Sequence, residues 1–242
     1  MALWTLTQIA DAVYNNVTTA LHGSPNSPIP KEQLRAECIL LRNTMHEQMV
    51  MEKGAECAKA PGYSFYQQQI NCLEVKSGDP SDCCEGGDGE TMPMVRIPEI
   101  LITGSTPHIS YIGTVKRSPL NFPWRVYYGE SFRINQFLPG SGKLPYGILY
   151  PARNGYHNLY IYNAPPGLTT LSITGVFMNP YSVYEYSCCG LSGEGEAEDV
   201  ATFAAPEFVV NAIIEQMSQR YIGYYRQMNV PIQQNDQTDK ST

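Results

Sequence analysis

The stretch PEFVVNAIIEQMSQRYIGYYRQM, residues 206–228, has the apolar spacing of one long amphipathic helix. Its apolar side chains recur at steps of three and four residues, which places them on one face of the helix and polar side chains on the other. A single helix cannot bury such a face alone, so this face must pack on other helices of the chain or on a neighbouring subunit. The residues expected to form this interface are Val209, Ile213, Met217, Tyr221 and Tyr224.

Two further segments with helical spacing, 5–22 and 30–53, lie at the beginning of the chain. In the first, the apolar stripe consists of Ile9, Val13, Val17 and Leu21. In the second, we expect Leu34, Cys38, Leu41, Met45 and Met49 on the inside, with Arg35, Glu37, Arg42 and Glu47 outside. The stretch Gly23–Pro30 contains three prolines, and Pro30 suits the first position of a helix. The sequence therefore predicts an antiparallel helical hairpin.

The middle of the chain, 55–199, changes from helical spacing to short runs rich in tyrosine and bounded by Gly and Pro, which is typical of β-strands. The predicted fold class is α+β: the hairpin and the last helix form a small bundle from 1–54 and 200–228, into which an antiparallel β-sandwich or barrel is inserted. Residues 229–242 are mostly polar and are predicted to be a flexible tail. The predicted strands lie in Tyr63–Val75, Met94–Ile102, Ile109–Val115, Trp124–Tyr128, Ser131–Phe137, Gly147–Tyr150, Asn158–Ala164, Thr170–Met178 and Val183–Cys188.

The charge of the chain excludes one class of function and suggests another. A formal net charge of −7 argues against a protein that grips nucleic-acid phosphates, which requires a basic surface. Acidic residues concentrate in 74–90 and 185–199, whereas basic residues prevail in 91–153. Such polarity suits a head-to-tail contact between copies of the chain, although the acidic segments could equally be solvated loops. The most apolar run, Met92–Ile102, is far too short and too charged to cross a membrane, so no membrane partner is expected.

The seven cysteines form no CxxC pair, and their odd number argues against a complete disulfide framework. We expect most of them to be reduced and buried. A disulfide formed after assembly, or a metal bound by converging thiolates, remains a weaker alternative. The residues that could converge on a metal are Cys72, Cys83, Cys84, Cys188 and Cys189.

Motifs for catalysis are incomplete. Gly140–Lys143 resembles the end of a phosphate-binding loop, but Leu144 replaces the hydroxyl residue that would bind magnesium. Gly190–Glu194 begins like a nucleophile elbow and then lacks its second glycine. The four histidines are widely separated, and the acidic stretch Asp79–Glu90 lacks the spacing of a calcium loop. The sequence therefore predicts no enzyme activity and no cofactor.

Six segments of the chain can be compared with known families: Thr7–Val13, Ile29–Leu34, Tyr66–Leu73, Asp82–Cys84, Ile97–Ile100 and Ile109–Gly113. Together they resemble structural proteins of crAss-like tailed bacteriophages, in particular the ring proteins that connect head and tail in the neck. The resemblance implies about a dozen copies closed into a ring, which contacts the portal and adjacent ring or tail proteins. It also implies a virion protein, made and assembled in the cytoplasm of the bacterial host, that surrounds double-stranded DNA without sequence-specific binding.

Two other functions stay open at this point. The tyrosine-rich strands near Tyr146–Tyr162 could present aromatic platforms to a host surface glycan, with the helices attaching the module to the virion. A hydrolase could use His157 or His108 with nearby carboxylates, although no nucleophile or metal ligands accompany them in the sequence.

Overall fold

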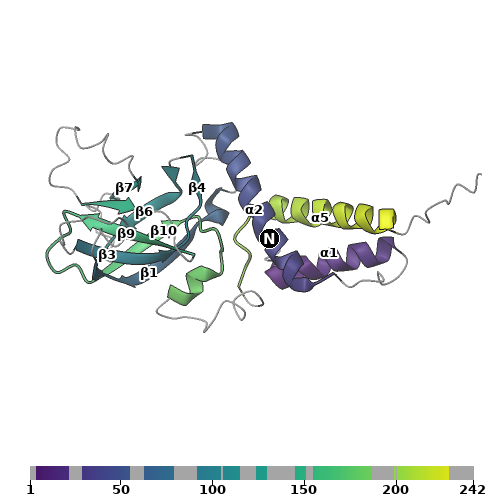
Figure 1. Cartoon of the computed structure of the whole chain (residues 1–242), viewed down its shortest axis with the longest axis horizontal. Helices are drawn as coiled ribbons and strands as arrows, with labels where there is room; N and C mark the ends of the chain where they lie inside the picture. The colour runs from purple at the N-terminus through teal and green to yellow at the C-terminus, as the bar shows by residue number, and fades with distance from the viewer. Residues whose placement is uncertain are drawn as a thin grey trace, which may run out of the picture.

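A computed structural model of the chain describes residues 4–21, 29–54, 63–78, 92–104, 106–114, 124–129, 145–150, 155–186, 199 and 201–228. Helices gather at one end of the molecule and strands at the other (Figure 1). The predicted α+β organisation is confirmed, with the β module inserted between the helices of the two chain ends.

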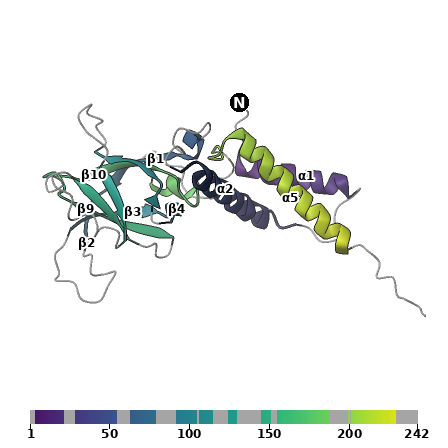
Figure 2. The same ribbon diagram turned by 90° about the horizontal axis from the view of Figure 1, so that it is seen from above.

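Helices α1 (Leu6–Ala20) and α5 (Glu207–Met228) lie side by side and run in the same direction, as seen from above in Figure 2. Their starts are tied together because the Phe203 amide donates to the Trp4 carbonyl (2.7 Å). Thr5 caps α1 through a reciprocal pair of hydrogen bonds with Gln8, the pattern that satisfies free amides at a helix start.

Helix α2 (Lys31–Lys53) crosses the first half of α1 and then continues to the β module. Lys31 forms an ion pair with Asp11 (2.7 Å), and Arg35 donates a hydrogen bond to the Thr7 hydroxyl (2.8 Å). Moving forward along α2 thus means moving backward along α1, so the two helices are antiparallel where they meet, as the sequence predicts. Gly54 ends α2 with a positive φ of 53°, a conformation that favours glycine.

The β module consists of two main sheets. The first has the order β1 (Gln68–Glu74), β10 (Thr170–Gly175), β6 (Ile109–Gly113). The second has the order β2 (Lys76–Gly78), β3 (Met92–Pro98), β9 (Tyr156–Tyr162), β8 (Tyr146–Leu149), β7 (Arg125–Tyr128). Only Val75 separates β1 from β2, so one extended segment passes from one sheet to the other at that residue. A two-stranded ribbon, β4 (Ile102–Thr103) and β5 (Thr106–Pro107), completes the described strands.

Two hydrophobic cores stabilise these parts. The core of the β module lies between the sheets and is mainly aliphatic, with Ile97, Leu159 and Ile173 among its fully buried side chains. The core of the helices joins α1, α2 and α5, and it extends into the β module by including Tyr66 and Tyr181. The helical unit therefore does not end cleanly at the expected boundaries of 54 and 200.

Several details differ from the sequence prediction. The segment Val183–Cys188, predicted as a strand, contributes to the short 3-10 helix η5 (Ser182–Tyr186). Strands β7 and β8 pair in parallel, whereas the prediction was purely antiparallel. The described strands form no closed barrel; they form two main sheets that enclose a core, as in a sandwich. Several predicted regions lie outside the described residues: the strand Ser131–Phe137, the tail 229–242 and most of the two acidic segments, 74–90 and 185–199.

Candidate functional site

The joint between helices and β module is built around Arg42, whose side chain has no exposed surface. Its Nε donates to the Ala204 carbonyl (2.7 Å), one Nη to the Phe177 carbonyl (3.0 Å) and the other to the Tyr66 carbonyl (3.2 Å). These three carbonyls come from three separate segments of the chain. One guanidinium group thereby fixes α2 to the start of β1, to the end of β10 and to the entry of α5.

The prediction that Arg42 lies on the exposed face of α2 is wrong. Charged side chains are rarely buried, and the exception here follows from the rigid fork of donors that an arginine offers to backbone oxygens. Burial lowers the pKa of Arg42 to about 10, which still leaves it charged at neutral pH. The signal in the sequence was the four-residue spacing of Leu34, Cys38, Arg42 and His46, all of which are buried.

Asn43 and His46 extend this polar layer. Asn43 accepts a hydrogen bond from Arg42 and donates to the Met178 carbonyl (2.9 Å). The His46 ring is fully buried and packs edge-on against Tyr66 (4.7 Å between centroids) and His108 (4.9 Å). Burial, followed by the neighbouring His108 and Arg42, lowers the pKa of His46 to about 3, so the ring is neutral at physiological pH.

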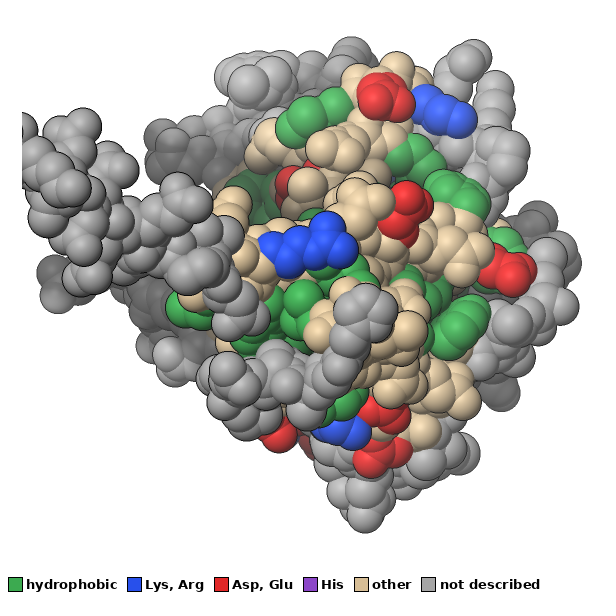
Figure 3. Space-filling view, turned by 90° about the vertical axis from the view of Figure 1, so that its right-hand side faces the viewer, with side chains coloured by type: hydrophobic (Ala, Val, Ile, Leu, Met, Phe, Trp, Pro, Cys, Tyr) green, Lys and Arg blue, Asp and Glu red, His purple; other side chains and the backbone are tan. Residues whose placement is uncertain are grey.

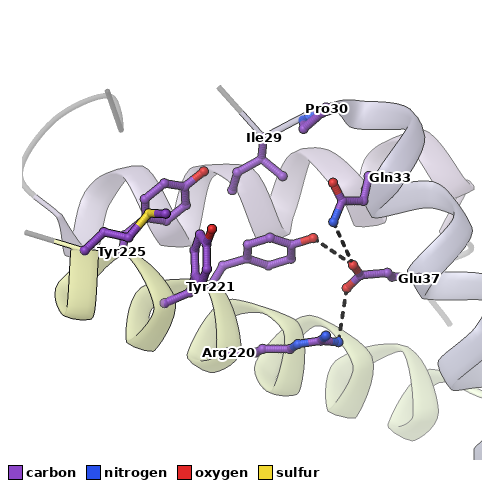
Figure 4. A pocket seen from close by; sticks show the side chains of 9 residues that line it. Ile29, Pro30, Gln33, Glu37, Arg220, Tyr221 and Tyr225 are labelled. Atoms are coloured by element: carbon purple, nitrogen blue, oxygen red, sulfur yellow. Dashed lines mark hydrogen bonds and ion pairs between the residues drawn. The ribbon is translucent and has the colours of Figure 1, made fainter. Parts of the chain in front are cut away.

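A groove of about 420 Å³ lies between the start of α2 and the end of α5 (Figure 4). Its walls are largely apolar and aromatic, and its polar groups gather at one end. There Glu37 accepts hydrogen bonds from Gln33 (3.1 Å) and from the hydroxyl of Tyr221 (3.0 Å), and it faces Arg220 (3.5 Å). Burial and then the bond to Glu37 raise the pKa of Tyr221 above its ordinary value. The lining residues are Ile29, Pro30, Gln33, Glu37, Arg220, Tyr221, Tyr224, Tyr225 and Met228.

The residues expected to form an interface divide into two groups. Val209, Ile213, Met217 and Tyr221 are buried inside the chain against α1 and α2, so in this structure they stabilise the helical unit itself. Tyr224 is half exposed and borders the groove. The sequence allowed this face of α5 to pack either on the other helices of the chain or on a neighbouring subunit. The structure shows packing within the chain for Val209, Ile213, Met217 and Tyr221.

Large hydrophobic side chains that stay exposed are concentrated on the helices. The end view of the helical unit shows such side chains interspersed with acidic and basic ones (Figure 3). Among the described residues, those on α2 and α5 are Leu40, Met51, Phe208, Tyr224 and Met228, and Phe65 lies near the β module. The spacing of the apolar stripes did not identify Leu40, Met51 or Phe208, because they lie outside the predicted faces.

The second sheet carries tyrosines on the face turned away from the core. Tyr146 and Tyr162 are cross-strand neighbours whose rings stack (5.0 Å between centroids, 2° between planes). Tyr127 meets Tyr146 edge-on, and Tyr150 meets Tyr160 in the same way. Burial, followed by the nearby Tyr150, raises the pKa of Tyr162 to about 12. These rings are at most half exposed, and each packs on another ring.

The described part of the chain brings together no constellation for hydrolysis. The Nδ1 atom of His157 donates to the Tyr150 carbonyl (2.6 Å), and Nε2 of His108 lies 2.8 Å from the Thr103 hydroxyl. Neither histidine contacts a carboxylate among the described residues. His157 is buried in the β module, which keeps it from acting as a base on a dissolved substrate.

The described cysteines do not converge on a metal. Cys72 is exposed at an irregularity of β1, where the register shifts and its φ is 58°, whereas Cys38 is buried beside Met217. Burial raises the pKa of Cys38 to about 12, so it is an inert thiol. Within the described ranges no group of three potential ligands occurs, and the candidates Cys83, Cys84, Cys188 and Cys189 lie outside those ranges.

Comparison with known protein families and with curated proteins finds no match to this chain. Of the helices that the structure describes, none combines the length and the apolar character needed to cross a membrane.

Proposed function

We propose that the protein is a non-enzymatic virion component, a ring-forming connector in the neck between portal and tail that surrounds the channel for the genome. The observation that carries this proposal is the set of exposed hydrophobic side chains on α2 and α5, led by Met51 (72% exposed), Leu40 (63%) and Phe208 (60%). Exposed apolar side chains gathered on one part of a molecule are typical of protein–protein contact surfaces.

The joint around Arg42 supports the same function. A connector transmits force between head and tail, so its parts must hold a fixed relative orientation. Arg42 and Asn43 bond carbonyls of Tyr66, Phe177, Met178 and Ala204, and this ties the helical unit to the β module in one geometry. The net charge of −7 is also suited to a wall along which DNA slides, because like charge repels phosphates.

The test is sedimentation velocity on the full chain over a wide concentration range, alone and with the portal ring of the same virus. We expect either closed rings of about a dozen copies or binding that needs the portal as a template. The double substitution Leu40→Ser and Met51→Ser should weaken assembly at least about tenfold, because apolar contacts at the centre of an interface supply most of its affinity.

Phe65→Ser is the matched control, since Phe65 is exposed but lies on η2 (Tyr63–Tyr66), outside α2 and α5. It should leave assembly unchanged. A chain that stays monomeric at every concentration, with and without the portal, would refute the proposal.

A glycan-binding module is the second candidate, supported by the row of tyrosines Tyr127, Tyr146 and Tyr162 across β7, β8 and β9. Aromatic rings on a sheet face are a common platform for sugars. The stacking of Tyr146 on Tyr162 leaves less ring surface for a ligand, which is why we place this function second. Binding to a glycan array that is lost in Tyr146→Ala would favour it over the connector.

A further inference from the structure

The groove between α2 and α5 ends where the described chain ends. Met228 is the last residue of α5 and forms part of the groove wall. The sequence continues for 14 residues, Asn229–Thr242, and the apolar residues of this segment, Val230, Pro231 and Ile232, follow within four positions of Met228. An apolar groove and a short apolar segment are thus adjacent along the chain.

We propose that this groove is the binding site for the chain's own segment 230–234, Val-Pro-Ile-Gln-Gln, folded back along α5. The proposal does not depend on the connector function.

The sequence after α5 favours such a reversal. Asparagine directly after a helix commonly adopts the left-handed conformation that turns the chain back, and proline often follows one or two residues later. Asn229 and Pro231 occupy these positions. In this type of helix end, the residue after the turn makes a hydrophobic contact with the last helical turn, so Val230 would meet Tyr225 or Tyr224.

The lengths agree as well. From Met228 to Tyr221 the groove follows seven residues of α5, or about 10 Å at 1.5 Å per residue. An extended segment 229–232 spans about 13 Å, which covers that distance and leaves a few ångström for the turn. Gln233 and Gln234 then arrive at the polar end of the groove, where Gln33, Glu37 and Arg220 can exchange hydrogen bonds with their amides.

The chemistry of the walls suits a proline-containing segment. Tyr221, Tyr224 and Tyr225 line one side of the groove and Pro30 the other, and aromatic grooves are a recurrent binding site for extended proline-containing peptides. Docking would cover Tyr224 and Met228, which are 52% and 63% exposed in the described part of the chain. Because the segment is covalently attached one residue away, its effective concentration at its own groove exceeds that of any neighbour's tail.

Methyl NMR on the full-length chain, labelled at Val and Ile methyl groups, tests this proposal. We expect upfield-shifted Val230 and Ile232 methyl signals with nuclear Overhauser contacts to the Tyr221 and Tyr225 rings. The double variant Tyr224→Ser and Met228→Ser should lose these shifts and contacts. Both residues are more than half exposed, so the fold should tolerate the change. Phe208→Ser, an exposed residue of α5 outside the groove, should retain them.

A mixing experiment separates the chain's own tail from a neighbour's. Chains with Val230→Asp and Ile232→Asp keep an intact groove, and chains with Tyr224→Ser and Met228→Ser keep an intact tail. After the two are mixed and re-equilibrated, the intact tail should stay unshifted, because it can use only its own defective groove. Recovery of the shifts would show that the groove takes the tail of another copy. Random-coil methyl signals in the wild-type chain would also overturn the proposal.

Discussion

Arg35 and Arg42 lie seven residues apart on the same helix, and their surroundings differ completely. Arg35 belongs to the first half of α2, which crosses α1, and it pairs with Asp199 (3.2 Å) and Thr7 (2.8 Å) at the protein surface. Arg42 belongs to the second half, which meets the β module, and its described partners are three backbone carbonyls and Asn43. The Arg35 side chain is still 24% exposed and its partner Asp199 is 57% exposed, so water reaches this pair. The Arg42 side chain is fully buried and takes the place of water as the donor to buried backbone oxygens.

The comparison shows how two cores of different character become one molecule. The helices and the sheets bury separate sets of apolar side chains, and apolar packing is nearly indifferent to orientation. A buried hydrogen-bonding group favours one relative orientation of the parts it joins, because any other orientation leaves buried polar atoms without partners. We infer that the second half of α2 sets the angle between the helices and the β module.

The largest effect is expected from Arg42→Met. This change keeps an unbranched stem but shortens the side chain, and it removes the donors to three carbonyls, those of Tyr66, Phe177 and Ala204. Each buried oxygen without a partner costs about 1–3 kcal/mol, so the free energy of unfolding should fall by about 3 kcal/mol or more. Equilibrium denaturation by urea measures it.

Arg42→Lys distinguishes charge from geometry. Lysine keeps the positive charge but lacks the planar fork, so its stability should resemble that of Arg42→Met. If the lysine variant were as stable as the wild type, the charge alone would stabilise the joint, and the idea of an orienting clamp would fail.

A smaller, pH-dependent effect is expected from His46. Its pKa is about 3 in the folded chain and near 6.5 when unfolded, so between these values the unfolded chain binds a proton that the folded chain does not. The stability of the folded state should therefore decrease as the pH falls from 6.5 towards 3. His46→Phe keeps a ring against Tyr66 and His108 and should reduce this decrease.

Thermal unfolding followed between pH 7 and pH 4 measures the difference. Burial also lowers the pKa of His108, so some acid sensitivity should persist in the variant. Equal slopes for the wild type and His46→Phe would show that His46 takes up a proton without opening the joint.

Much of the fold could be predicted because the apolar patterns are local. Three helices, their antiparallel hairpin and most strands follow from spacing and from Gly or Pro boundaries. The strand predicted at Val183–Cys188 is wrong because Val and Tyr favour strands by composition, whereas contacts with the surrounding chain fold this segment into the turn of η5. The parallel pairing of β7 and β8 also depends on distant segments, and no local pattern encodes it.

The joint and the groove were harder to predict for the same reason. From the sequence alone Arg42 is expected at the surface, because it is charged. Its burial depends on three carbonyls, at residues 66, 177 and 204, which only the folded chain brings together. The groove combines Ile29 and Pro30 with the end of α5, nearly 200 positions away along the chain. Spacing did identify Tyr221 and Tyr224, but it could not show that one is buried and the other exposed.

The smallest effect is expected from Arg35→Met, the counterpart of Arg42→Met on the first half of α2. Asp199 is more than half exposed and water can replace the lost partner, so the free energy of unfolding should change by no more than about 1 kcal/mol. The same urea titration measures it, and added salt should shrink the difference further. A loss as large as that of Arg42→Met would mean that both halves of α2 are held by buried polar contacts. The difference in burial between the two arginines would then not lead to a difference in stability, and Arg42 would have no special role in orienting the two parts.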